Sequence, residues 1–203
     1  RLGGEIYSLA FDEPLCCVRE HIHLPDSHAI EETAQYIALV RKHFPNTKLG
    51  DIEPYPMNGG GLIDWVDALE KRLAELGVKG MDFFRVDVNW GHFTMGGTVR
   101  PGNYLELKKL EQACRKRRMP FSLIYWAADQ ELMRRSGKGD DFNWYLGIMR
   151  MGNDYLFVNG APDQYVIESW VKAPALTVPE SAEWSFTRSA RDFLRRYVPE
   201  HRR

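Results

Sequence analysis

Apolar residues follow two different spacings along this chain. Short stretches rich in apolar residues alternate with longer ones in which apolar residues recur every three or four positions, and these patterns predict strands and amphipathic helices respectively. Strand and helix follow each other five times, at roughly 40 residues a unit. The predicted strands are residues 5–11, 48–52, 83–90, 120–126 and 164–170, and the predicted helices are residues 27–43, 62–76, 104–118, 141–151 and 181–197. Residues 15–26, which follow Pro14, are predicted to form a loop.

The central predicted strand has two different faces. Its apolar residues alternate with three polar ones, which are Arg85, Asp87 and Asn89. Strands of a parallel sheet are usually apolar on both faces, because helices cover each side. We therefore expect the polar face to line a barrel interior, or the end of a sheet where a polar ligand binds.

The regular alternation predicts an α/β fold with a parallel sheet and right-handed crossover connections. Two architectures fit: an open doubly wound sheet of five strands, and a (β/α)8 barrel that needs three further units. The polar strand face favours the barrel, because only a barrel directs one face of every strand at a common axis. Residues 1–4, Arg-Leu-Gly-Gly, have the pattern of a helix C-terminus. We expect a single domain, residues 1–203, that is a partial TIM-type barrel of strands four to eight and lacks its N-terminal units.

Carboxylates recur where the predicted strands end. The six candidate catalytic residues are Asp12, Glu13, Asp51, Glu53, Asp87 and Glu168. In both architectures ligands bind at the carboxyl ends of the strands, so we expect these side chains to converge on one bowl. Carboxylates that crowd together cannot all ionise, and this is the arrangement that acid–base chemistry on sugars requires.

Aromatic side chains accompany the carboxylates. The candidate substrate-binding residues are Tyr55, Trp90, Tyr125, Trp126 and Trp170, together with Arg85 and Asn89. Flat rings suit the apolar faces of sugars, although rings also fill cores. A strand-end carboxylate can equally cap a loop, and Arg85 can be a structural partner of Asp87.

Two short motifs carry a resemblance to a known class of enzymes. LAFDEPL at residues 9–15 and GDIEPYP at residues 50–56 resemble strand ends of (β/α)8 glycoside-hydrolase-like proteins. Glu13-Pro14 is similar to the Asn-Glu-Pro that carries the acid/base glutamate after the fourth strand of retaining barrel glycosidases. ESW at residues 168–170, followed by TVPE at residues 177–180, looks like the last strand and helix of such a barrel. The resemblance implies a glycosidase in which Glu13 is the general acid.

The sequence departs from that pattern in two places. Asp12 stands where the motif has asparagine, and the fourth predicted strand has no glutamate where those enzymes place their nucleophile. The nearest acidic residue there is Asp129, in the following loop. The nucleophile or base therefore stays unassigned among Asp51, Glu53, Asp87 and Glu168.

Two other functions remain open on the same fold. Carboxylates from successive strands can hold Mg²⁺ or Mn²⁺ in a sugar isomerase or lyase, and a barrel can bind carbohydrate without catalysis. We expect no metal or other cofactor, and an oligo- or polysaccharide as the binding partner.

Composition narrows the remaining classes. The net charge of -1 gives no electrostatic footprint for nucleic acid or an anionic membrane. The 44% hydrophobic residues include no run long enough to span a bilayer, so we expect a soluble globular protein. Three cysteines do not make a disulfide framework, so the compartment stays open. We expect an extracellular or periplasmic location rather than a cytoplasmic one, and the oligomeric state is not predicted.

Overall fold

The computed structural model of this chain describes residues 5–56, 61–90, 93, 102–127 and 140–198. Five parallel strands form one sheet in the order β1-β2-β3-β4-β5. The strands are β1 (Ser8–Asp12), β2 (Lys48–Tyr55), β3 (Phe83–Val88), β4 (Phe121–Tyr125) and β5 (Gln164–Ile167). The helices are α1 (Pro14–Cys17), the π-helix η1 (Val18–Ile22), α2 (Asp26–His43), α3 (Leu62–Glu75), α5 (Tyr104–Lys116), α7 (Asp140–Phe157) and α8 (Phe186–Tyr197).

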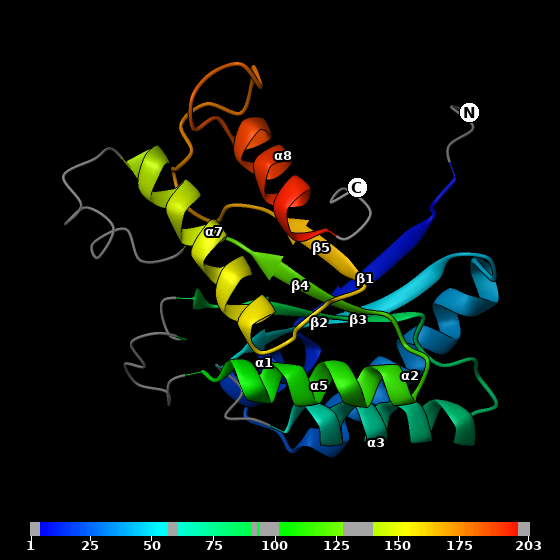
Figure 1. Ribbon diagram of the computed structural model, residues 1–203. Coiled ribbons are helices and arrows are strands. Elements are labelled where there is room, and N and C mark those ends of the chain that lie inside the picture. Colours follow the sequence, from blue (N-terminus) through cyan, green and yellow to red (C-terminus); the bar gives the residue numbers. More distant parts are fainter. Residues whose placement is uncertain (1–4, 57–60, 91–92, 94–101, 128–139, 199–203) are drawn as a thin grey trace.

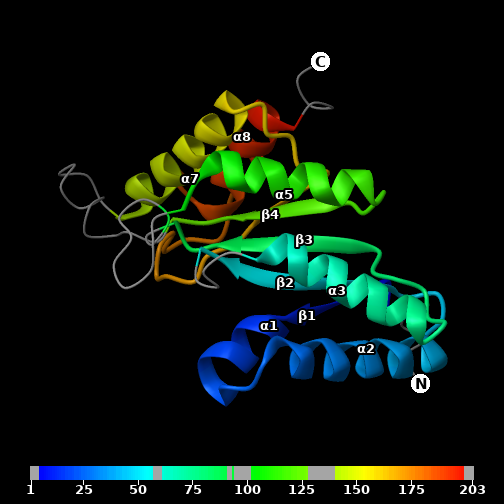
Figure 2. The same cartoon turned by 90° about the horizontal axis from the view of Figure 1, so that it is seen from below.

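The five strands lie side by side in the order in which they occur along the chain, and Figure 2 shows β1 to β4 in this order. Each pairs in parallel with the next, for example Asp51 opposite Phe84 and Phe84 opposite Phe121. The prediction of an α/β fold with a parallel sheet is therefore confirmed. A doubly wound sheet reverses its strand order at a switch point, and no such reversal occurs among these five strands.

The long helices pack on one face of the sheet, which we call the helix-covered face. In Figure 1, α2, α3 and α5 lie together beneath the strands. Side chains of α2, α3, α5 and α8 contact strand residues that all point to this face. The contacts are Tyr36 with Phe11, Trp65 with Asp51, Glu106 with Tyr55, and Phe193 with Tyr125. The core lies between the sheet and these helices, where Phe84, Val86 and Val88 of β3 are fully buried. Each such side chain contributes about 1.5–3 kcal/mol by leaving water.

The other face of the sheet carries the polar residues, and we call it the polar face. Its strand positions alternate with the buried ones and follow the register between strands, so that Asp12 lies opposite Ile52, Ile52 opposite Arg85, and Arg85 opposite Ser122. Asp87 follows two residues after Arg85 on the same strand. The expectation that the central strand has one apolar and one polar face therefore agrees with its burial pattern, in which Arg85 and Asp87 alone are half-buried.

Strand β2 continues three residues beyond its predicted end. The predicted strand ended at Ile52, and the added residues include Pro54, which cannot donate a ladder hydrogen bond. Ile52 directs its carbonyl at β1, where it accepts from the Glu13 N–H at 2.8 Å, whereas the Tyr55 carbonyl accepts from Asn89 on the β3 side. The backbone nitrogen and carbonyl of Pro54 point towards the β1 side, as those of Ile52 do. The last residue of β1, Asp12, pairs with Ile52, so no β1 residue lies opposite Pro54. The missing N–H therefore breaks no ladder bond, and the strand continues through the proline.

The loop prediction for residues 15–26 is wrong. Helices α1 and η1 occupy residues 14–22, directly after β1. Pro14 stands at the first helical position, where a proline loses no intrahelical bond. The predicted helix start at residue 181 is also wrong, because α8 begins at Phe186 after Ser185, whose Oγ accepts from the Arg188 N–H.

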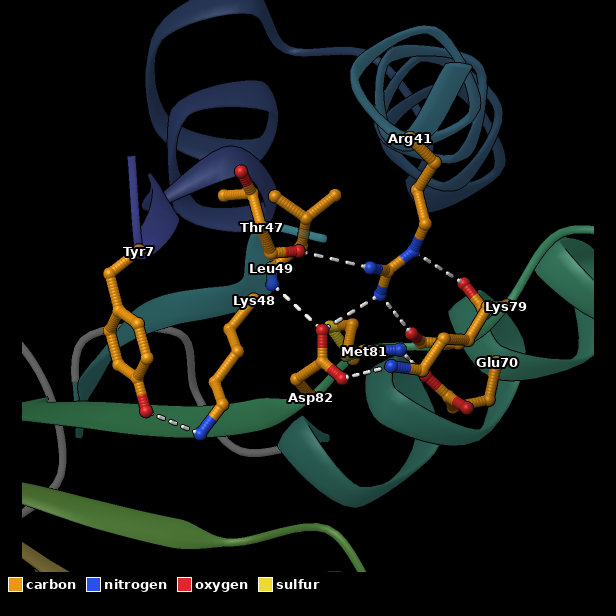
Figure 3. Close-up of polar contacts among 10 residues, drawn as sticks. Tyr7, Arg41, Thr47, Lys48, Leu49, Glu70, Lys79, Met81 and Asp82 are labelled. Carbon is orange, nitrogen blue, oxygen red and sulfur yellow. Dashed lines mark hydrogen bonds and ion pairs between the residues drawn. The ribbon is translucent and has the colours of Figure 1, made fainter. Parts of the chain in front are cut away.

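Buried charges hold the amino-terminal ends of the strands together (Figure 3). Arg41 of α2 pairs with Asp82, just before β3, at 3.0 Å, and both side chains are largely buried. The same Asp82 oxygen accepts from the Leu49 N–H of β2 at 2.9 Å, and Arg41 also donates to the carbonyl of Gly80. This network lies at the opposite strand ends from the acidic residues. Among the described residues, no helix has the length and apolar character needed to cross a bilayer.

Candidate functional site

Four of the six predicted carboxylates gather at the carboxyl ends of β1, β3 and β5, and we call them the acidic cluster. They are Asp12, Glu13, Asp87 and Glu168, and each of the last three carries a raised pKa to which carboxylates of the cluster contribute. Three non-adjacent parts of the chain supply these residues, so only the sheet brings them together. The arrangement favours protonated and ionised carboxyls side by side, as general acid–base chemistry needs.

Glu13 is held in an uncommon backbone conformation. Its φ of 57° and ψ of 40° are left-handed, a region that non-glycine residues seldom adopt. The hydrogen bond from its N–H to Ile52 fixes this turn between β1 and α1. Burial raises the pKa of the half-buried Glu13 carboxyl, and Asp12 and Asp87 raise it further, while His21 opposes them. Strained backbone of this kind concentrates at functional sites.

Asp87 receives hydrogen bonds from indole groups. The Trp126 Nε1–H donates to Asp87 Oδ1 at 2.9 Å, because Trp126 follows β4, the neighbour of β3. Burial raises the pKa of Asp87, hydrogen bonding from Trp126 opposes that rise, Asp12 adds to it, and Trp170 opposes it. Within the described residues, Asp87 therefore has donors that stabilise its ionised form, and Glu13 has none.

Glu168 directly follows β5 and completes the cluster. Its Oε1 is buried and has no hydrogen-bond partner among the described residues. Burial and the charge of Asp87 raise the pKa of Glu168, whereas hydrogen bonding from Trp170 and the charge of Arg85 lower it. An unpaired buried carboxylate oxygen is costly, and it marks a place where a ligand's hydroxyl or amide can bind.

The predicted aromatic residues divide between the two sides of the sheet. Trp170 is 63% exposed beside Asp87 and Glu168, so its ring can stack on a ligand, and Trp126 contributes its indole N–H. Trp90 and Tyr125 are each only 1% exposed and pack on one another at 5.9 Å. These two rings belong to the core between α5, α8 and the sheet, on the opposite side from Trp170.

Tyr55 likewise serves the helix side. It is almost fully buried, its hydroxyl donates to Glu106 Oε2 at 2.6 Å, and the same hydroxyl accepts from the Asn103 N–H at 3.0 Å. It thereby anchors the start of α5. Asn89, directly after β3, is half-buried, and its carbonyl accepts from the Phe93 N–H.

Asp51 and Glu53 share one face, as predicted, but that face is the helix-covered one. The Glu53 carboxylate accepts from the N–H groups of Leu15 and Cys16 at 2.6 and 3.2 Å, so it caps the first turn of α1. Asp51 accepts from Trp65 Nε1 at 2.7 Å. The two side chains are fully buried on the opposite face of the sheet from the acidic cluster, which corrects the expectation that all six carboxylates converge.

Three residues that sequence reasoning missed, Ser122, Phe83 and Gly50, organise the polar face. Ser122, fully buried on β4, accepts from Arg85 Nε at 3.2 Å, and the Phe83 ring lies under the Arg85 guanidinium at 5.3 Å. Gly50 leaves room for that ring, since a Cβ there would meet Phe83 at 2.3 Å. The available signal was a lone serine in the apolar stretch FSLIY, two residues from Ile124 and four from Trp126 on the same face.

The metal-dependent alternative requires a group of side chains arranged to bind a metal ion. In the described ranges, no group of three or more histidine, cysteine or acidic residues is arranged to hold a metal ion. Asp129, the acidic residue noted in the loop after β4, lies outside those ranges.

The acidic cluster, the indole donors and the exposed Trp170 ring together form a site that can protonate one group, deprotonate another and stack a flat apolar surface. Comparisons of the chain with protein families, with curated proteins and with solved structures find no match.

Proposed function

We propose that the chain is the part of a (β/α)8 barrel that contains strands four to eight, and that it belongs to a carbohydrate-active hydrolase. The sequential strand order and the placement of the long helices on one face support the barrel, because a singly wound sheet closes in this way. The single observation that carries the function is the acidic cluster beside the exposed Trp170 at the carboxyl ends of the strands.

Glu13 is the general acid in this proposal. Its carboxyl lies among other carboxylates, with burial as the main influence, so it holds a proton at a pH where ordinary glutamates have lost theirs. It gives this proton to the glycosidic oxygen as the bond between that oxygen and the anomeric carbon breaks. The leaving sugar departs as an alcohol, and the developing positive charge spreads over the ring oxygen and anomeric carbon.

Asp87 is the partner carboxylate. Hydrogen bonding from Trp126 and Trp170 favours its ionised form and fixes its orientation. It either bonds to the anomeric carbon or takes a proton from the water that attacks that carbon. Glu168 accepts a hydrogen bond from a sugar hydroxyl at Oε1, which has no partner among the described residues, and the Trp170 ring packs on the sugar. The substrate is an oligo- or polysaccharide.

The test uses the protein expressed with any coding sequence that flanks these residues. Hydrolysis of a panel of glycans is measured for the wild type, for Glu13→Gln, for Asp87→Asn and for the exposed control Glu32→Gln. We expect a loss of about 100-fold or more for the two site variants and none for the control. Glu13→Gln should lose less on aryl glycosides with acidic phenols, whose leaving group needs no proton. Unchanged hydrolysis by both site variants would refute the proposal.

A further inference from the structure

Arg85 presents an anchored positive charge beside the acidic cluster. It occupies the third position of β3, on the polar face, two residues before Asp87, and its side chain is half-buried. Burial disfavours its charged form while Glu168 favours it. A guanidinium keeps its proton in proteins at any physiological pH, so the charge persists.

Two neighbours hold the guanidinium in one orientation, and a third residue holds one of those neighbours in place. Its Nε–H donates to the buried Ser122 Oγ at 3.2 Å, and one flat side lies over the Phe83 ring at 5.3 Å from the centroid. Phe83 is itself fixed over Gly50, where any Cβ would collide with the ring. The Arg85 side chain is therefore already ordered in the free protein, and ligand binding costs little of its conformational entropy.

Among the residues that the structure describes, the two terminal amino groups of Arg85 have no hydrogen-bond acceptor. Within the described residues, Arg85 makes no ion pair at 4.0 Å or less, and its one hydrogen bond uses Nε. Glu168 acts on it through space only. Among the described residues both terminal amino groups are thus available, and the half-buried cation, which Glu168 influences without forming an ion pair, gains from binding an anion.

We propose that Arg85 binds the carboxylate of an acidic sugar, so that the substrate is a uronic-acid-containing glycan. This inference rests on the proposed function, because it places that sugar beside Glu13 and Asp87. The two terminal amino groups match a planar carboxylate through two parallel hydrogen bonds. The carboxylates of the acidic cluster repel an anionic sugar. Such a sugar can therefore bind there only if the positive charge of Arg85 offsets that repulsion.

The test measures binding separately from hydrolysis. In the full protein carrying Glu13→Gln, calorimetry compares an oligomer of galacturonic acid, the same oligomer with its carboxyls reduced to alcohols, and a sulfated neutral oligosaccharide. We expect the uronate oligomer to bind most tightly. Arg85→Gln should weaken its binding about 10- to 100-fold and leave the reduced oligomer unaffected. Arg85→Lys should recover part of the affinity, and the exposed control Arg150→Gln should change nothing.

Several results would overturn the inference. These are equal binding of the acidic and reduced oligomers, preference for the sulfated one, absence of uronate binding, or unaltered affinity in Arg85→Gln. Ser122→Ala provides a milder variant if Arg85→Gln does not fold, because it releases only the Nε contact and should weaken uronate binding a few-fold. Hydrolysis of neutral glycans without uronate binding defeats this inference alone, whereas uronate binding without hydrolysis of any glycan defeats the proposed function alone.

Discussion

The indole of Trp126 donates its N–H to Oδ1 of Asp87 at 2.9 Å, linking the end of β4 to the end of β3. This bond stabilises the charged form of a carboxylate that burial and Asp12 drive towards protonation. Trp126→Phe keeps the ring and removes the donor. We expect the midpoint of the Asp87 titration to rise by about one pH unit, measured by carbon NMR of labelled aspartate.

A matched variant on the other face separates this local effect from a general one. Trp65→Phe removes the donor to Asp51 and should leave the Asp87 titration where it is. An Asp87 midpoint that stays constant in Trp126→Phe would show that the hydrogen bond does not hold the carboxylate in its charged form.

The left-handed backbone at Glu13 predicts a difference in stability between two variants that both lack its carboxyl. Glu13→Gly relieves the left-handed conformation, whereas Glu13→Ala removes the same carboxyl and keeps the strain. We expect the glycine variant to be more stable than the alanine variant by about 1 kcal/mol in urea unfolding, with both inactive. Equal stabilities would mean that the turn carries no strain.

Because the pKa of Asp51 is raised, we expect its contribution to the free energy of unfolding to fall as the pH rises. Burial and Glu53 raise its pKa well above the ordinary 3.8, while the bond from Trp65 opposes them. The stability contributed by its neutral form is fully present below 3.8 and is lost as the pH rises through the folded-state pKa. Asp51→Asn mimics that neutral form, so it should be more stable than wild type at pH 8 by on the order of 1–3 kcal/mol.

Chemical unfolding at pH 4 and pH 8 measures this difference. The gain from Asp51→Asn should be much smaller at pH 4, and Asp64→Asn, which changes an exposed carboxylate of α3, should show no gain at either pH. A variant that is less stable than wild type at pH 8 would contradict the raised pKa of Asp51.

The ion pair of Figure 3 predicts the opposite behaviour in acid. Burial opposes ionisation of Asp82, but hydrogen bonds from Lys79, the Leu49 N–H and Arg41 outweigh it and lower its pKa below 3.8. The resulting stability is present above 3.8 and is lost as the pH falls through the lowered folded-state pKa. Asp82→Asn should therefore destabilise the protein by about 2–4 kcal/mol at pH 7 and by much less near pH 2.

Lys79 supplies the comparison for that measurement. It contacts the same carboxylate but is 68% exposed, so Lys79→Gln should change the free energy of unfolding by less than about 1 kcal/mol. If Lys79→Gln lowered the free energy of unfolding more than Asp82→Asn does, the exposed Lys79 contact, and not the buried Arg41 pair, would be the main source of stability.

Periodicity alone determined much of this fold. The stripe of leucines and valines in residues 62–76 predicted α3 to within one residue, and the alternation of strand and helix predicted a parallel sheet. It also predicted the two faces of β3, because side chains alternate along any extended strand. Helix α1 was missed because its first turn is satisfied by Glu53, a residue 38 positions from Leu15.

The acidic cluster shows where local sequence stops being informative. Alternation established that Asp51 and Glu53 share a face, and that Arg85 and Asp87 share one, but it could not say that the two faces are opposite. Register between strands decides that question, and it is set by packing against Trp65 and the other helix residues. The sequence by itself determined the five strands, the long helices between and after them, and the residue types available for chemistry. Only the tertiary structure selected which carboxylates meet, because the pairing of distant strands fixes the direction of every side chain on them.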